Sequence, residues 1–130
     1  MVNDPISDML TRIRNAQAVD HQTVVLPFSK LKMNLAEILE KEGLVGEVSS
    51  QGKKIDKVIK INLKYSKGEP VINNIKRISK PGRRIYIKKD EIKPIRQGFG
   101  MTVISTSQGL MTNQEARKKG LGGEVLCEIY

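Results

Sequence analysis

The sequence predicts an α+β protein made of two small lobes. Apolar residues recur at helical spacing in two segments of the first half, whereas the second half alternates apolar and polar residues in short, strand-like runs. The segment 65–70, Tyr-Ser-Lys-Gly-Glu-Pro, breaks both patterns. We therefore expect an N-terminal lobe over residues 1–65, a linker over 66–70 and a C-terminal lobe over 71–130.

The N-terminal lobe is expected to pack two helices on a short sheet. Asp4 and Pro5 are suited to be the N-cap and first residue of one helix, and Ser29 and Gly43 to start and stop the other. The apolar stripes are Ile6, Met9, Leu10 and Ile13 in the first helix and Leu31, Leu35, Ile38 and Leu39 in the second. Strands are expected at 23–28, 44–49 and 55–64.

The C-terminal lobe is expected to be mostly short strands with one short helix. Thr112 and Glu115 form a capping box at the start of that helix, and the glycines of 120–123 end it. The strands are expected at 71–78, 84–88, 101–105 and 124–130, with a turn at 80–83. In the last strand, Val125, Cys127 and Ile129 are expected on one face.

Composition places the chain among folded proteins that need no covalent or metal support. Hydrophobic residues make up 38% of the 130 residues, too many for a disordered basic tail. Cys127 is the only cysteine, so no disulfide and no set of thiolate metal ligands can form within the chain. No apolar run has the length of a membrane span, and the N-terminus lacks a signal-peptide core. We therefore expect a cytoplasmic protein with no membrane partner.

Positive charge is concentrated in the second half of the chain. Residues 66–130 hold 13 basic and 6 acidic side chains, which gives +7 of the net charge of +9, and nine of the basic groups lie within 76–96. Such a field attracts a polyanion, although basic residues also solvate exposed strand edges. We favour the polyanion because a merely solvated surface mixes both signs. A membrane surface is less favoured, because these residues are not on an amphipathic helix.

Two segments have side chains suited to nucleic acid. Arg84, Tyr86 and Lys88 face outward from a predicted strand, where the ring can stack on a base while the cations hold phosphates; the alternative is ordinary strand packing of the tyrosine. The loop 105–109, Ser-Thr-Ser-Gln-Gly, places three hydroxyls and a glycine ahead of a helix whose dipole favours phosphate. It is equally consistent with a turn that caps itself.

Catalytic chemistry has no plausible candidates in this sequence. His21 is the only histidine and lies in a polar loop, and no nucleophile elbow, Walker sequence or HExxH pattern occurs. Gly98-Phe99-Gly100 lacks the third glycine of a dinucleotide loop and precedes a strand. We therefore predict no enzymatic activity, no cofactor, no metal and no small-molecule substrate.

Several sequence blocks, in order and with matching spacing, resemble one family along the whole chain. The blocks are 4–15, 29–32, 42–43, 77–82 with Tyr86, 104–112, 115–117 and 120–126, and the 104–112 block reads Ile-Ser-Thr-Ser-Gln-Gly-Leu-Met-Thr. They closely resemble the bacterial small-subunit ribosomal protein eight family. One departure is Glu128, an acidic residue where the family pattern has a neutral or aromatic one.

The resemblance implies a two-lobed structural protein of the small ribosomal subunit. Its RNA partner would be the central domain of the small-subunit rRNA, whose folding and assembly it helps to organise beside neighbouring ribosomal proteins. The resemblance also implies translational repression of its own operon through the mRNA. The loop 105–109 would reach the RNA, with Tyr86 beside it and Glu124 supporting it.

The expected site therefore combines residues from the resemblance with residues from the charge pattern. The RNA-binding residues are Ser105, Thr106, Ser107, Gly109, Tyr86, Arg84, Lys88, Lys76, Arg77 and Arg83, and the supporting residues are Thr112 and Glu124. The alternative function is a free-standing RNA- or DNA-binding regulator that uses the same basic lobe.

Overall fold

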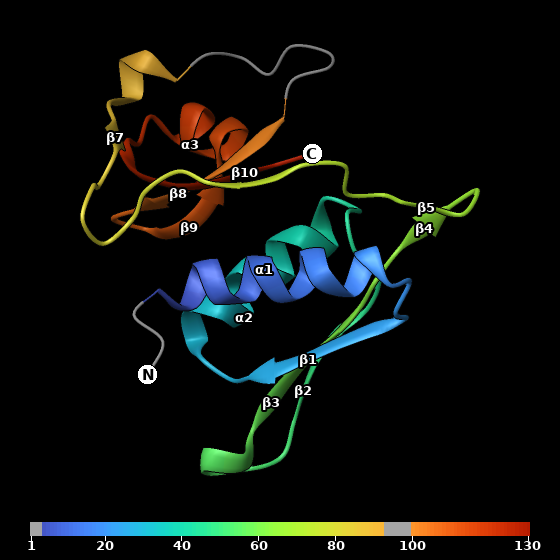
Figure 1. Ribbon diagram of the computed structural model, residues 1–130. Helices are drawn as coiled ribbons and strands as arrows, with labels where there is room; N and C mark the ends of the chain where they lie inside the picture. The colour runs from blue at the N-terminus through green and yellow to red at the C-terminus, as the bar shows by residue number, and fades with distance from the viewer. Residues whose placement is uncertain (1–3, 93–99) are drawn as a thin grey trace. The chain divides into compact units, whose positions relative to one another are not determined.

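The computed structural model describes residues 4–92 and 100–130, and the chain divides into two compact units (Figure 1). One unit is Pro5–Asn73, and the other is Asn74–Tyr130 together with Asp4. Each contains helix and antiparallel sheet, which confirms the predicted α+β class. Lys93, Arg96, Gly98 and Phe99, which belong to the basic segment and the glycine pair considered above, lie outside the described residues.

The unit Pro5–Asn73 packs two helices together over a three-stranded sheet (Figure 1). The sheet order is β1-β3-β2, antiparallel throughout. Its elements are α1 (Pro5–Ala18), β1 (Thr23–Pro27), α2 (Lys30–Lys41), β2 (Val48–Gln51), the 3-10 turn η1 (Lys54–Asp56), β3 (Val58–Asn62), β4 (Tyr65–Ser66) and β5 (Glu69–Pro70). The predicted linker 66–70 falls within the hairpin of β4 and β5, and the lobe boundary itself stays a prediction.

Both helix starts agree with the sequence prediction. Helix α1 begins at Pro5, and its predicted stripe Ile6, Met9, Leu10 and Ile13 is buried. Helix α2 is capped by Ser29, whose hydroxyl accepts a hydrogen bond from the Lys32 amide at 3.2 Å. Gly43 follows its end with a φ of +75°, in the left-handed region that glycine tolerates.

Three details of this unit differ from the prediction. Leu31 is 40% exposed, and Lys32 and Ala36 are buried instead, so the apolar stripe of α2 is rotated. Burial lowers the pKa of Lys32, an effect that the nearby Asp8 carboxylate opposes. The strand expected at 44–49 begins only at Val48, because the Leu44 amide donates to the Leu39 carbonyl and still belongs to the helix end. The strand expected at 55–64 shortens to β3, because its first residues form η1.

The other unit is built around β10 (Gly123–Ile129). The strand order is β6-β10-β8-β9, and β7 also pairs with β10. The remaining elements are β6 (Ile75–Arg77), β7 (Tyr86–Ile87), the 3-10 turn η2 (Lys89–Glu91), β8 (Met101–Thr106), β9 (Gly109–Thr112) and α3 (Asn113–Lys119). Helix α3 packs on β8 and β9 over a cluster of Ile92, Ile104, Met111, Ala116 and Val125. The strands expected at 71–78 and 84–88 are observed as β6 and β7, which are shorter than predicted.

The caps of α3 are as predicted, but a strand precedes it that the sequence pattern does not predict. The Thr112 hydroxyl accepts a hydrogen bond from the Glu115 amide at 3.2 Å, and Gly120 ends the helix with a φ of +67°. Residues 107–108 form only a two-residue turn, because Thr106 pairs with Gly109 and the chain continues as β9. With apolar residues only at 110 and 111, β9 is too short to show a strand pattern in the sequence.

A β-bulge in β10 overturns the prediction that Val125, Cys127 and Ile129 share one face. Val125 pairs with Ile104, but Cys127 pairs with the preceding residue, Val103, so the register shifts at Leu126. Because adjacent residues of β8 point to opposite faces, Val125 faces the α3 cluster, and Cys127 and Ile129 face the other way.

Burial raises the pKa of the Cys127 thiol to about 12, so this cysteine is a protonated packing residue.

The glycines after α3 are required for two different reasons. The prediction that the whole run 120–123 is a helix stop is therefore wrong. Only Gly120 ends the helix. A Cβ on Gly122 would overlap the Ile87 carbonyl oxygen, and a Cβ on Gly123 would overlap the Ser105 carbonyl oxygen. Strand β10 can therefore lie between β7 and β8 at this point only because these two residues have no side chain.

We expect Gly123→Ala to lower the free energy of unfolding by about 2 kcal/mol or more, because the new methyl group meets backbone that cannot rotate away. Gly82→Ala is the matched control, since no atom lies within 4 Å of its Cβ position, and we expect a change within about 0.5 kcal/mol. Urea unfolding of both variants measures the difference. Equal stabilities would show that the strands can separate to admit a side chain.

Candidate nucleic-acid interface

Three neighbouring strands place an aromatic, an acidic and a hydroxyl side chain in one row. Glu124 on β10 lies directly opposite Tyr86 on β7 and directly opposite Ser105 on β8. Residues directly opposite one another in antiparallel strands share a face of the sheet. Tyr86 is 69% exposed, so its ring is a solvent-facing surface and not part of the core. The packing alternative for Tyr86 is therefore not what the structure shows.

Glu124 anchors Arg84 in this row. The Arg84 guanidinium lies 3.1 Å from a Glu124 carboxylate oxygen, and the two side chains are 53% and 14% exposed, respectively. Because Glu124 is the more buried partner, it fixes the position of a guanidinium that remains open to solvent. The pair also offsets one positive charge, so Arg84 attracts an anion less strongly than an unpaired cation would.

The turn at residues 105–109 is held together by Thr106. The Thr106 hydroxyl donates to the Gly109 carbonyl oxygen at 2.8 Å and accepts from the Gln108 amide at 3.1 Å. The hydroxyls of Ser105 and Ser107 make no hydrogen bond within the described part of the chain, and Ser107 is exposed. The self-capping alternative therefore describes Thr106, while the two serines keep their hydroxyls available to a ligand. Gly109 has a φ of +107°, which a β-branched residue adopts only with strain.

The expectation that the dipole of α3 favours phosphate at this turn is wrong. Strand β9 lies between the turn and α3, so residues 105–109 do not adjoin the helix N-terminus. Thr112, which we expect to support the site, is buried and caps α3 at the far end of β9. Its influence on the turn is therefore indirect, through the hairpin of β8 and β9.

Ser79 positions the segment of Arg84 and Tyr86, a role that the sequence does not predict. Its hydroxyl, fully buried, accepts from the Ile85 amide at 2.9 Å and donates to the Ile85 carbonyl oxygen at 3.1 Å. The Ser79 amide also donates to the Val125 carbonyl oxygen, and the Val125 amide donates to the Ile85 carbonyl oxygen. These two hydrogen bonds tie both sides of the 80–83 turn to β10. A polar residue between Ile78 and Lys80 gives no sequence signal of burial, so only the structure identifies this role.

The predicted basic residues do not all lie in the same place. Lys88 follows β7 and Arg83 lies in the 80–83 turn, and both are exposed. Lys76 lies opposite Glu128 across β6 and β10, so it faces the side of the sheet that carries α3, away from Tyr86 and Ser105. This cross-strand pairing also accounts for Glu128, whose acidic charge lies next to a lysine.

Arg77 is engaged inside the protein. Its side chain is 12% exposed, its guanidinium lies 3.1 Å from an Asp4 carboxylate oxygen, and it also donates to the Leu126 carbonyl oxygen. That carbonyl belongs to the bulged residue of β10 and also accepts from the Ile78 amide at 3.0 Å, so Arg77 adds a second donor where the ladder is irregular. The geometry favours a structural role for Arg77, in contrast to the exposed Arg84.

The fold and the exposed row define a small, basic α+β protein whose candidate site is polar and aromatic. Among the described residues, no group of three His, Cys, Asp or Glu side chains could hold a metal ion. Within the same ranges, no helix combines the length and apolar character needed to cross a membrane.

Comparison with known proteins identifies the family. Residues 4–130 match the family model described as Ribosomal protein S8. The small ribosomal subunit protein uS8 of Thermodesulfovibrio yellowstonii is 50% identical over 131 residues, covering all of both chains. The protein of the same name from Natranaerobius thermophilus is 52% identical over 99% of this chain and 98% of its own. The chain therefore belongs to the ribosomal protein S8 family, whose members are structural ribosomal proteins and not enzymes.

We expect Arg77→Met to lower the free energy of unfolding by about 1 to 2 kcal/mol, because it removes the partly buried guanidinium that pairs with Asp4 and donates to the Leu126 carbonyl oxygen. Lys76→Met is the matched control, an adjacent and exposed cation on the same strand, and we expect it to be nearly neutral. Urea unfolding compares the two variants. If Arg77→Met does not change the free energy of unfolding, the structural role of Arg77 is contradicted, and its guanidinium in the unchanged protein would again be a candidate RNA contact.

Proposed function

We propose that this protein is a cytoplasmic structural constituent of the small ribosomal subunit that binds the central domain of the small-subunit rRNA directly. The full-length similarity to proteins named small ribosomal subunit protein uS8 supports the ribosomal role. The observation that supports direct RNA binding is the row of the exposed Tyr86, the Arg84–Glu124 pair and the half-buried Ser105, which continues into the turn with the exposed Ser107. Its neighbours in the subunit would include other ribosomal proteins.

The residues of this row divide the work of recognition. Tyr86 offers a ring face on which a base can stack, and Ser105 and Ser107 offer hydroxyls to base edges or to the 2′-hydroxyl that distinguishes RNA from DNA. Arg84, Lys88 and Arg83 supply cations for phosphates. Thr106 and Gly109 shape the turn, and Glu124 and Ser79 position Arg84 and Tyr86. Specificity would then come from neutral groups, and affinity from charged ones.

Filter binding of the purified protein to a central-domain rRNA fragment, with an unrelated hairpin as control, tests this proposal. Preference for the fragment supports it, and equal binding to both RNAs contradicts it. Sedimentation addresses the alternative of a free-standing regulator, because a ribosomal constituent stays with small subunits after a moderate salt wash. We also propose that the same surface represses the protein's own operon by binding its mRNA, in which case the rRNA fragment should compete with that mRNA.

We expect Arg84→Gln and Lys88→Gln, made singly, to weaken binding to the specific fragment and to the unrelated hairpin by similar factors. Removing one cation that binds a phosphate should reduce the log-log salt slope by roughly one unit, because fewer counterions are released. Lys76→Gln is the matched control on the opposite face of the sheet and should leave the slope unchanged. A slope that responds only to Lys76 would move the phosphate contacts to the α3 side.

We expect Ser107→Ala to weaken specific binding roughly ten-fold, with little effect on the unrelated hairpin or on the salt slope. A neutral hydroxyl releases no counterion, and a hydrogen bond whose partner stays buried is worth on the order of 1 kcal/mol or somewhat more. Gly109→Val should have a similar selective effect by straining the turn at a φ of +107°.

Thr112→Ala is the control for indirect effects, since it removes the cap of α3 at a cost of about 1 kcal/mol in stability. Melting curves of all three variants accompany the binding data. If Ser107→Ala and Gly109→Val stay folded and bind the fragment like the unchanged protein, the turn makes no RNA contact.

A further inference from the structure

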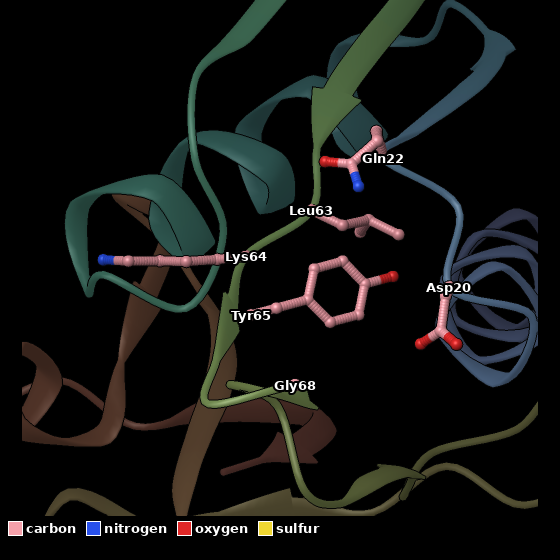
Figure 2. A pocket seen from close by; sticks show the side chains of 6 residues that line it. All are labelled: Asp20, Gln22, Leu63, Lys64, Tyr65 and Gly68. Carbon is pink, nitrogen blue, oxygen red and sulfur yellow. The ribbon is translucent and has the colours of Figure 1, made fainter.

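A pocket in the unit Pro5–Asn73 lies outside the proposed RNA surface. It has a volume of about 600 Å³, is open to solvent and is lined by Asp20, Gln22, Leu63, Lys64, Tyr65 and Gly68. Its walls come from the loop after α1, the two residues that follow β3 and the hairpin of β4 and β5. Figure 2 shows the Tyr65 ring between Leu63 and Gly68, with its hydroxyl directed toward the chain that carries Asp20.

The pocket is held in shape by two contacts across it. The Tyr65 hydroxyl donates to the His21 carbonyl oxygen at 2.6 Å, which fixes the plane of the ring. The Leu63 amide donates to the Gln22 carbonyl oxygen at 2.8 Å, which ties the loop to the end of β3. Asp20 has a φ of +56°, in the left-handed region, which aspartate and asparagine adopt more readily than most residues other than glycine.

The charge that this pocket offers is negative, in a protein whose net charge is +9. Within the described residues, Asp20 takes part in no ion pair. Lys64 donates its ammonium group to the Gly43 carbonyl oxygen at 3.3 Å, and Figure 2 shows its side chain leading away from the pocket. Burial and the negative charge of Asp20 both raise the pKa of Tyr65.

A group that satisfies this lining has to be cationic, planar and rich in hydrogen-bond donors. A carboxylate and an aromatic face together match a guanidinium, which pairs with carboxylates and stacks on rings. A lysine ammonium would meet the carboxylate but has no plane to stack. A nucleotide could stack on Tyr65, but it would bring a phosphate close to Asp20.

We propose that the pocket of Asp20, Gln22 and Tyr65 binds an arginine side chain from a protein partner. The binding site is thus a protein contact on the unit Pro5–Asn73, separate from the RNA contacts proposed for the other unit. It does not depend on the proposed RNA binding, because it can be measured with no RNA present.

Titration of the ¹⁵N-labelled full chain with the peptide acetyl-Gly-Arg-Gly-amide, followed by NMR, tests the proposal. We expect saturable shifts of the amides of Gln22 and of residues 63–68 at millimolar concentration, and at least several-fold weaker binding of acetyl-Gly-Lys-Gly-amide. Guanosine monophosphate is the third probe. Shifts with the nucleotide but not with the arginine peptide would overturn the proposal in favour of an RNA base, as would equal binding of the lysine peptide or no shifts at all.

Matched variants of the full chain identify the groups responsible. Asp20→Asn should weaken binding of the arginine peptide roughly five-fold, and asparagine tolerates the positive φ at this position. Asp56→Asn, at an exposed acid of η1 in the same unit, should have no effect. Tyr65→Phe and Tyr65→Leu both remove the hydrogen bond to His21, but only the leucine variant loses the ring face and should lose binding. Unchanged affinity in Asp20→Asn would overturn the proposal.

Discussion

The close approach of β10 to β7 and β8 at Gly122 and Gly123 determines the rest of the Asn74–Tyr130 unit. A strand with side chains at these two positions would collide with the carbonyl oxygens of Ile87 and Ser105. With hydrogen atoms there, β10 pairs with β8 along one edge and with β7 and β6 along the other. Glu124, the next residue, is consequently flanked by Tyr86 and Ser105. The close approach of the strands at Gly122 and Gly123 therefore also determines which side chains form the row.

The bulge at Leu126 lets β10 bury apolar side chains on both faces of the sheet. Before it, β10 turns Val125 toward the cluster under α3, and after it Cys127 and Ile129 are buried on the other face. A bulge interrupts regular pairing. The Leu126 carbonyl oxygen there accepts from the Ile78 amide and also from Arg77, whose charge Asp4 balances. Two arginines with similar sequence surroundings thus have different roles. Arg77 is buried at the irregular point of the sheet, and Arg84 stays at its surface.

Local sequence signals predicted the parts of the fold that depend on neighbouring residues. The caps at Ser29 and Thr112 and the helix stops at Gly43 and Gly120 agree with the structure, because each involves groups within four residues of one another. The bulge, β9 and the burial of Ser79 could not be predicted in this way. They depend on pairing with strands distant in sequence, and a single missed bulge moves every later side chain to the opposite face.

The candidate site shows the same division. The pattern at 84–88 correctly predicted which side chains face outward, but the sequence did not reveal that Lys76 faces the other side or that Arg77 is paired internally. In the turn, sequence chemistry left RNA contact and self-capping as equal alternatives. The structure assigns self-capping to Thr106 alone. A turn whose own hydrogen bonds are satisfied is already ordered, so the neighbouring serines would lose little conformational entropy when they meet a ligand. Self-capping is therefore compatible with the proposed recognition in this loop, because the hydroxyl that caps the turn is not one of those left available to a ligand.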